Sequence, residues 1–339
     1  MRSRCLTRST ELLRTFSLEN ASAPNLRSTL RSLAGVAVAA GAGAAVLAAR
    51  GQLAVALDEL AGGRRLPLAL AGGCAPLVPA LTAAAWRSVL ASSGMPLGVC
   101  QSWGCYGAGS LANTFLPARM GDALRIELFS RRLPDGRRRW LACGIAASIG
   151  LAQSVVLGLV LTFGSLAGAL PLWTIAPALA FPAVMLTGGR LASLSRPRGR
   201  IACLATASRL SPLAWTRLLA WISASAVARL LVIASVLDSL AVPHPLTTAL
   251  VATGGLALGN IVPVAPGSVG VAAATMAVAL GHMGLHASTA VAAAVSFHAF
   301  ETGAGVAFGI SGCLLLRLLP LRGRLREVAP KPALAVSTL

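Results

Sequence analysis

Charged and aromatic residues are scarce in this sequence of 339 residues. Only 12% of its residues are charged and 4% are aromatic, whereas 56% are hydrophobic and the mean hydropathy is +0.76. Apolar runs of about 20 residues recur along the chain, which is the length that a helix needs to cross a bilayer. No polar stretch is long enough to form a soluble domain. The composition excludes an ordinary soluble globular protein and predicts an all-α, polytopic membrane helix bundle.

Acidic residues are also few, since the chain has 10 Asp and Glu against 29 Lys and Arg and a formal net charge of +19. The only lysine is Lys331, so every other cation is an arginine. These arginines lie at the ends of apolar runs and in short connections, as expected for cytoplasmic loops under the positive-inside rule. The distribution argues against nucleic acid as a partner and favours contact with anionic membrane lipid.

Motifs for catalysis and metal binding are absent from the sequence. It has seven cysteines but no C-x-x-C pair, and several of these cysteines lie within apolar runs. It also lacks H-E-x-x-H, a P-loop, G-x-S-x-G and any Cys/His spacing typical of a metal site. We therefore expect cysteines that act as small hydrophobic residues, no metal or cofactor, and no enzymatic activity. A stand-alone lipid-modifying enzyme is the alternative, for which only His298 and Glu301 could supply an acid/base pair.

The apolar runs predict six full membrane spans within a domain of residues 33–319. The polar, basic tails 1–32 and 320–339 are expected to be cytoplasmic in a bacterial inner membrane. A cleaved signal peptide is an alternative for the N-terminus, but its basic region is unusually long. The second span ends at Trp86-Arg87, an aromatic and a cation suited to the membrane interface. The predicted spans are 33–49, 66–86, 140–166, 172–189, 218–240 and 287–319.

Two further apolar segments, 98–130 and 246–283, are interrupted by Asn, Pro and Gly. If 98–130 crossed the membrane, the five arginines in 131–139 would lie outside the cell. A re-entrant hairpin that begins and ends on the cytoplasmic side removes this conflict, and 246–283 fits a second hairpin from the outer side. Two hairpins from opposite faces suggest an inverted repeat. Chance recurrence of Asn, Pro and Gly is the alternative.

The first interruption carries charges close to the apolar run, where a charge costs about 2.5–3.5 kcal/mol on insertion scales. Arg119, Asp122 and Arg125 follow one another at intervals of three residues, so that Asp122 can reach both arginines on a helix. The two guanidinium groups could hold a lipid phosphate, with Asp122 orienting them. Alternatively, the three residues form a salt-bridged cluster that fixes the hairpin.

The remaining polar candidates lie in the second half of the chain. Gly267, Ser268 and Gly270 precede an apolar helix and could offer backbone N–H groups to an anion, or could form a plain turn. Arg229 lies within a span and could pair with a hairpin carboxylate, line a cavity or snorkel towards the interface. His298 and Glu301 share one face of the last span, where they could form a structural hydrogen bond or take part in proton coupling.

Two motifs in the chain resemble the lysylphosphatidylglycerol synthase transmembrane region, also called the flippase-like membrane family. The first combines the Trp86-Arg87 pair with the element formed by Asn113, Leu116, Pro117, Arg119, Gly121, Asp122 and Arg125. The second resembles P-x-x-P-G-[GS]-x-G and is formed by Pro263, Pro266, Gly267, Ser268 and Gly270. The resemblance covers residues from about 33 to 316.

The resemblance implies a protein that binds and translocates a phospholipid or a polyprenyl-phosphate-linked lipid. Arg87, Asn113 and Asn260 then join the lipid-phosphate site, with Arg229, His298 and Glu301 as supporting polar groups. The family commonly has an acidic residue where this chain has Ala273, and often an arginine where it has His298. We expect no aminoacyltransferase domain and no aminoacyl transfer. The alternative is a non-catalytic membrane partner of a separately encoded lipid synthase or glycosyltransferase.

Overall fold

The computed structural model describes five stretches of the chain, all within a unit that runs from Arg50 to Leu339. The helices in these stretches are α4 (Arg65–Cys74), α5 (Leu77–Ser92), α6 (Val99–Phe115), α7 (Met120–Ser130), α8 (Arg138–Leu166), α11 (Pro212–Ser239), α12 (Pro245–Gly259), α13 (Val269–His282) and α14 (Ala287–Leu318). No strand occurs in the described stretches, and the predicted all-α class is confirmed. The described residues are 61–115, 120–133, 138–166, 210–259 and 269–318, with Asp58, Gly168, Ala183 and Thr187.

Four helical segments among these residues are long and apolar enough to cross a membrane. They agree with four predicted spans, although the first extends beyond the predicted 66–86 and is divided at Ala75-Pro76, where α4 ends and α5 begins. α11 begins earlier than predicted because Ser211 caps it: the Ser211 side chain accepts a hydrogen bond from the Ala214 N–H, and Pro212 follows it. The predicted spans 33–49 and 172–189 lie outside the described residues. The four segments are Arg65–Ser92, Arg139–Leu166, Pro212–Ser239 and Ala287–Arg317.

The two interrupted segments form helical hairpins, as predicted. α6 packs against α7, and α12 packs against α13, with residues 116–119 and 260–268 between them outside the described part of the chain. The structure corrects the predicted extent of the first interruption, because Asn113 lies inside α6 and Gly121 inside α7. Gly121 allows close packing instead of breaking a helix, since a Cβ there would collide with the Gly109 carbonyl and with Asn113.

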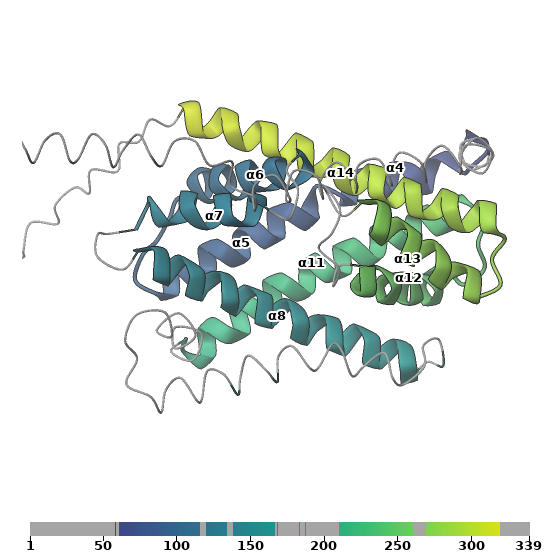
Figure 1. Cartoon of the computed structure of the whole chain (residues 1–339), viewed down its shortest axis with the longest axis horizontal. Helices are drawn as coiled ribbons and strands as arrows, with labels where there is room; N and C mark the ends of the chain where they lie inside the picture. Colours follow the sequence, from purple (N-terminus) through teal and green to yellow (C-terminus); the bar gives the residue numbers. More distant parts are fainter. Residues whose placement is uncertain are drawn as a thin grey trace, which may run out of the picture. The chain divides into compact units, whose positions relative to one another are not determined.

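The first described span and α11 run antiparallel. The Arg64 N–H donates to the Ser239 carbonyl at 3.0 Å, and the Ser225 hydroxyl donates to the Val78 carbonyl at 3.1 Å. The hairpin α6–α7 follows the end of the first span and precedes α8. In the same way, the hairpin α12–α13 follows α11 and precedes α14. The two hairpins therefore lie at opposite ends of the antiparallel pair (Figure 1). This arrangement is the one that the predicted inverted repeat requires.

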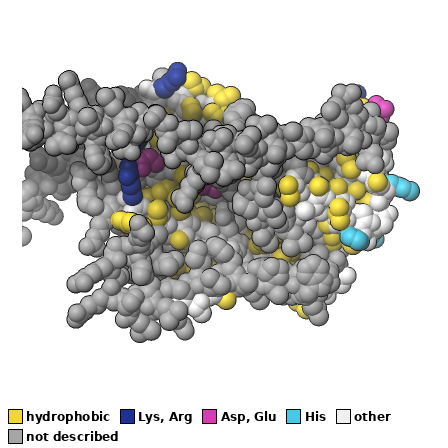
Figure 2. Space-filling model, viewed as in Figure 1, with side chains coloured by type: hydrophobic (Ala, Val, Ile, Leu, Met, Phe, Trp, Pro, Cys, Tyr) yellow, Lys and Arg dark blue, Asp and Glu magenta, His cyan; other side chains and the backbone are white. Residues whose placement is uncertain are grey.

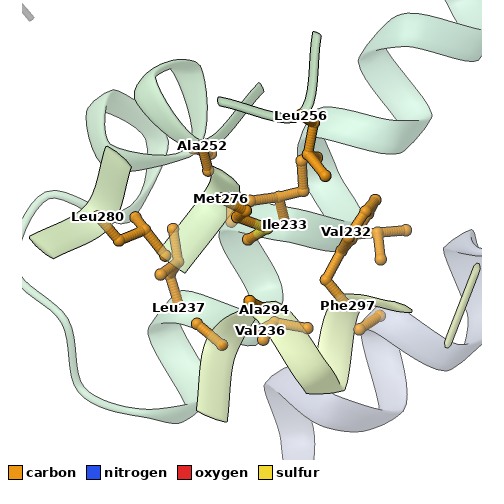
Figure 3. Close-up of a cluster of buried hydrophobic side chains, with 14 of the residues drawn as sticks. Val232, Ile233, Val236, Leu237, Ala252, Leu256, Met276, Leu280, Ala294 and Phe297 are labelled. Atoms are coloured by element: carbon orange, nitrogen blue, oxygen red, sulfur yellow. The ribbon is translucent and has the colours of Figure 1, made fainter. Parts of the chain in front are cut away.

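Two clusters of buried apolar side chains hold these helices. One joins α11, α12, α13 and α14 through residues such as Ile233, Leu256, Met276 and Phe297 (Figure 3). The other joins α5, α7, α8 and α11 around Trp86. Trp86 is only 3% exposed, and its ring stacks on Phe129 with 4.5 Å between ring centroids. Trp86 is thus a core residue, and the predicted end of the second span at Trp86-Arg87 is wrong, because α5 continues to Ser92.

α14 contacts one helix of each hairpin. The N-terminal part of α14 packs against α13, and its C-terminal part packs against α6. Its contact with α6 is backbone to backbone, because glycines meet on both helices. The Cα of Gly312 lies 3.2 Å from where a Cβ on Gly107 would stand, and the Gly104 carbonyl is equally close to a Cβ on Gly312. Beside these glycines, the Trp103 indole N–H donates to the Ser311 hydroxyl at 3.0 Å.

Candidate functional site

A network of polar side chains links the two helices of the first hairpin. The Asp122 carboxylate accepts hydrogen bonds from the Asn113 side-chain amide at 3.0 Å and from Nη1 of Arg125 at 2.8 Å. Nη2 of Arg125 donates to the Ser110 hydroxyl at 3.4 Å, and its Cζ lies 4.0 Å from the centroid of the Tyr106 ring. One carboxylate therefore joins α6 to α7, while the guanidinium stacks on the only tyrosine in the chain.

The network follows from helical spacing on both sides of the hairpin. Tyr106, Ser110 and Asn113 recur at intervals of four and three residues, so they lie on one face of α6. Asp122 and Arg125 are three residues apart on α7 and form the predicted ion pair. Close approach of the helices at Gly109 and Gly121 brings the two faces within hydrogen-bonding distance.

Arg125 is turned towards the inside of the hairpin. Its side chain is 12% exposed, whereas the Asp122 side chain is 46% exposed. Two of its donors are bound to Asp122 and Ser110, and its Nε is buried without a hydrogen-bond partner among the described residues. The two bonds hold the guanidinium against Asp122 and Ser110 and leave the Nε–H without a partner in the described part of the chain.

A second group of charges lies at the base of the first hairpin. The Glu127 carboxylate accepts from Nε of Arg131 and from Nε of Arg139, each at 3.1 Å, and thereby ties the end of α7 to the start of α8. Arg87 is also exposed, and its Nε donates to the Leu97 carbonyl at 3.3 Å. In the part of the chain that the structure describes, Arg87 makes no bond to the Asn113–Asp122–Arg125 network.

A separate ion pair joins α11 to α14. Nη2 of Arg229 donates to Oε1 of Glu301, and Nδ1 of His298 lies 3.7 Å from Oε2 of the same carboxylate. The suggestion that Arg229 pairs with a hairpin carboxylate is wrong, because its partner lies on the last span. The prediction that His298 and Glu301 share a face of α14 is confirmed.

The remaining predicted site residues lie mostly outside the described residues. These are Arg119 at the end of the first interruption, and Asn260, Gly267 and Ser268 in the second. Gly270 falls within the first turn of α13. The proposed anion-binding turn therefore stays a prediction.

Three participants in these networks were not predicted from the sequence. Tyr106 and Ser110 hold Arg125, and Glu127 joins the arginines at the hairpin base. A signal for the first two was available, because a tyrosine and a serine four residues apart are polar exceptions on an apolar helix and face the same side as Asn113.

The fold and these polar groups define a polytopic helical membrane protein with charged clusters between its apolar helices. A family model, described as the lysylphosphatidylglycerol synthase TM region, matches residues 32–309. The chain belongs to this family, and the match includes both hairpins, Arg229, His298 and Glu301. No curated protein matches the chain.

Proposed function

We propose that this protein binds the phosphate-bearing headgroup of a membrane lipid at its first hairpin and moves the lipid across the bilayer. The observation that carries the proposal is the Asn113–Asp122–Arg125 network between the two helices of the first hairpin. A charge kept at membrane depth is costly and generally faces a partner, a cavity or a ligand. The lipid is a phospholipid or a polyprenyl-phosphate-linked lipid, in keeping with the family to which the chain belongs.

The two arginines of the motif have different roles in this proposal. Arg125 positions Asp122, because its Nη1 donates to that carboxylate and its side chain is only 12% exposed. Arg119 supplies the guanidinium that meets the phosphate, for which its planar fork is suited. Asp122 is half-exposed. The 267–270 turn of the second hairpin supplies backbone donors.

The charges at the two hairpin bases support a cytoplasmic origin for the first hairpin. Arg131, Arg132 and Arg139 lie beside its base, whereas residues 241–246 and 283–286 at the other base contain no lysine or arginine. Figure 2 shows histidine side chains at the end where α12 and α13 lie. The positive-inside rule then places the first base in the cytoplasm and the second outside, with both termini cytoplasmic in a bacterial inner membrane.

The test is lipid movement in proteoliposomes that contain fluorescent phosphatidylglycerol, followed by chemical quenching of the label in the outer leaflet. We expect Arg119→Ala to reduce the rate about tenfold or more, the loss typical of one charged contact. Arg217→Ala is the matched control, because Arg217 is an exposed arginine on α11, away from the network.

Normal translocation by the double variant Arg119→Ala/Arg125→Ala would refute the assignment. Wild-type protein that moves no lipid but co-purifies with a synthase or glycosyltransferase would favour the role of a membrane partner instead.

A further inference from the structure

Three polar side chains meet between the middle parts of α11 and α14. Oε1 of Glu301 accepts from Arg229, and Oε2 faces Nδ1 of His298 at 3.7 Å. Glu301 lies near the midpoint of α14 and Arg229 lies within a turn of the midpoint of α11. Helices of this length cross a hydrocarbon core of about 30 Å, so the group lies deep in the membrane.

His298 is the most buried member of this group. Its side chain is 9% exposed, and the neighbouring Phe297 packs among the core residues shown in Figure 3. Nε2 of His298 is buried and has no hydrogen-bond partner among the described residues. A buried polar atom without a hydrogen bond destabilises the folded state, so its presence in a native structure indicates a functional role.

The facing carboxylate determines what this free nitrogen can do. A carboxylate beside Nδ1 favours a proton on that nitrogen, which leaves Nε2 of the neutral imidazole with its lone pair free. Arg229 balances the charge of the same carboxylate from the other side. The resting group is therefore neutral overall, with a buried proton acceptor at one end.

We propose that His298 is a proton-binding site in the membrane interior, with Glu301 as the group that orients and neutralises it and Arg229 as a competing cation. A hydronium ion of bulk water gives up a proton: its O–H bond breaks, an N–H bond forms at Nε2, a water molecule is left, and the group passes from neutral to singly positive. Glu301 is then shared by two cations, which weakens its bond to Arg229 and hence one link between α11 and α14. The inference rests on these contacts and not on lipid transport.

Few other charges can influence this site. Of the described helices that pack against α14, α6 has no charged residue, and α13 has only His282 at its exposed end. A Cβ on Gly72 of α4 would lie 3.4 Å from the Phe300 ring, and Arg65 and Arg87 are seven and fifteen residues from Gly72. The other charged residues of α11 and α14 are Arg217, Asp238 and Arg317, which lie nine or more residues from Arg229 or Glu301. Arg229 from α11 and Glu301 from α14 itself therefore dominate the electrostatics of His298.

The test uses nitrogen NMR of the full chain in lipid nanodiscs. His244, His282 and His286 are exposed, so His244→Asn/His282→Gln/His286→Gln leaves His298 as the only labelled imidazole. Asn is chosen at position 244 because the backbone there has a φ of 52°, which Asn tolerates. Spectra are recorded from about pH 5 to about pH 9, a range that brackets an ordinary imidazole.

We expect the neutral form to carry its proton on Nδ1 and the second proton to arrive at Nε2 as the pH falls. Glu301→Gln should lower the proton affinity of His298 about tenfold, because it removes the negative charge that stabilises the imidazolium. Arg229→Gln should raise this affinity, because it removes the cation that competes for Glu301. A neutral form protonated on Nε2, or an imidazole that stays neutral over the whole range, would overturn the proposal. The tautomer is measured in the histidine variant alone, so the test does not depend on lipid movement or on the folding of the Glu301 and Arg229 variants.

Discussion

The first hairpin holds its two helices together with polar groups, whereas the described part of the second hairpin does so with apolar ones. In α6–α7, Asp122 accepts hydrogen bonds from both helices. In α12–α13, Leu256 and Met276 belong to one buried apolar cluster, and Gly255 lets α12 approach α13 closely. The hydroxyls of Thr253 and Thr275 bond to carbonyls of their own helices.

This difference separates two ways to close a helical hairpin. Apolar packing needs only matching shapes, and lipid tails compete with it on nearly equal terms. A hydrogen-bonded carboxylate fixes one register between α6 and α7, because any shift would leave charged groups unpaired. The first hairpin is thus held in one register by charged groups, and the described part of the second is held by apolar packing.

The largest expected contrast between the hairpins is the side of the membrane on which a cysteine at each hairpin base is accessible to a thiol reagent. Cys100 is exposed at the start of α6 and serves as a native reporter once the other six cysteines are replaced. In that background without Cys100, His286→Cys reports on the base of the second hairpin. We expect an impermeant maleimide to label Cys100 from the cytoplasmic side and the position 286 reporter from outside. Labelling of both from one side would rule out opposite entry.

Truncation of an apolar contact should damage the second hairpin most. Met276 is completely buried, so Met276→Ala leaves a cavity and should lower the free energy of unfolding by about 2 kcal/mol or more. Val278→Ala on the same helix is the control, since that side chain is 61% exposed, and it should have little effect. Thermal unfolding in detergent measures the stability of both variants. Equal losses of stability would show that the buried Met276 contact does not hold the second hairpin together.

The glycine contact between the first hairpin and α14 should be next in sensitivity. Gly312→Leu forces a side chain against the backbone of α6 and should cost about 1–3 kcal/mol. Gly303→Leu is the control on the same helix, because no atom lies within 4 Å of a Cβ at that position. Unfolding temperatures should fall for the first variant and stay level or rise for the second; if both behaved alike, the close contact would not contribute.

The smallest expected effect concerns the ring under Arg125. Tyr106→Leu removes the cation–π contact and should cost about 0.5–2 kcal/mol, whereas Tyr106→Phe keeps the ring and should be nearly neutral. Unfolding curves of the two variants give the difference directly. A larger loss in the Phe variant would mean that the hydroxyl, and not the ring, supports the first hairpin.

Hydropathy and helical spacing predicted several parts of the fold and site. Four spans, two helical hairpins, the Asp122–Arg125 ion pair and the proximity of His298 to Glu301 were all available from local sequence. Such features depend on apolar length or on residues three apart on one helix, which the chain itself determines. Asn113 and Gly121 were wrongly predicted to break a helix, because their packing against each other depends on the fold and not on local sequence.

By itself, the sequence determined the class of protein, the order of its membrane segments and the contacts within single helices. Only the tertiary structure decided that Arg229 pairs with Glu301, that Trp86 stacks on Phe129 and that Arg125 lies over Tyr106. The physical reason is that partners on different helices depend on the rotation and register with which those helices pack. These are determined jointly by glycine contacts and buried clusters distributed over the whole chain.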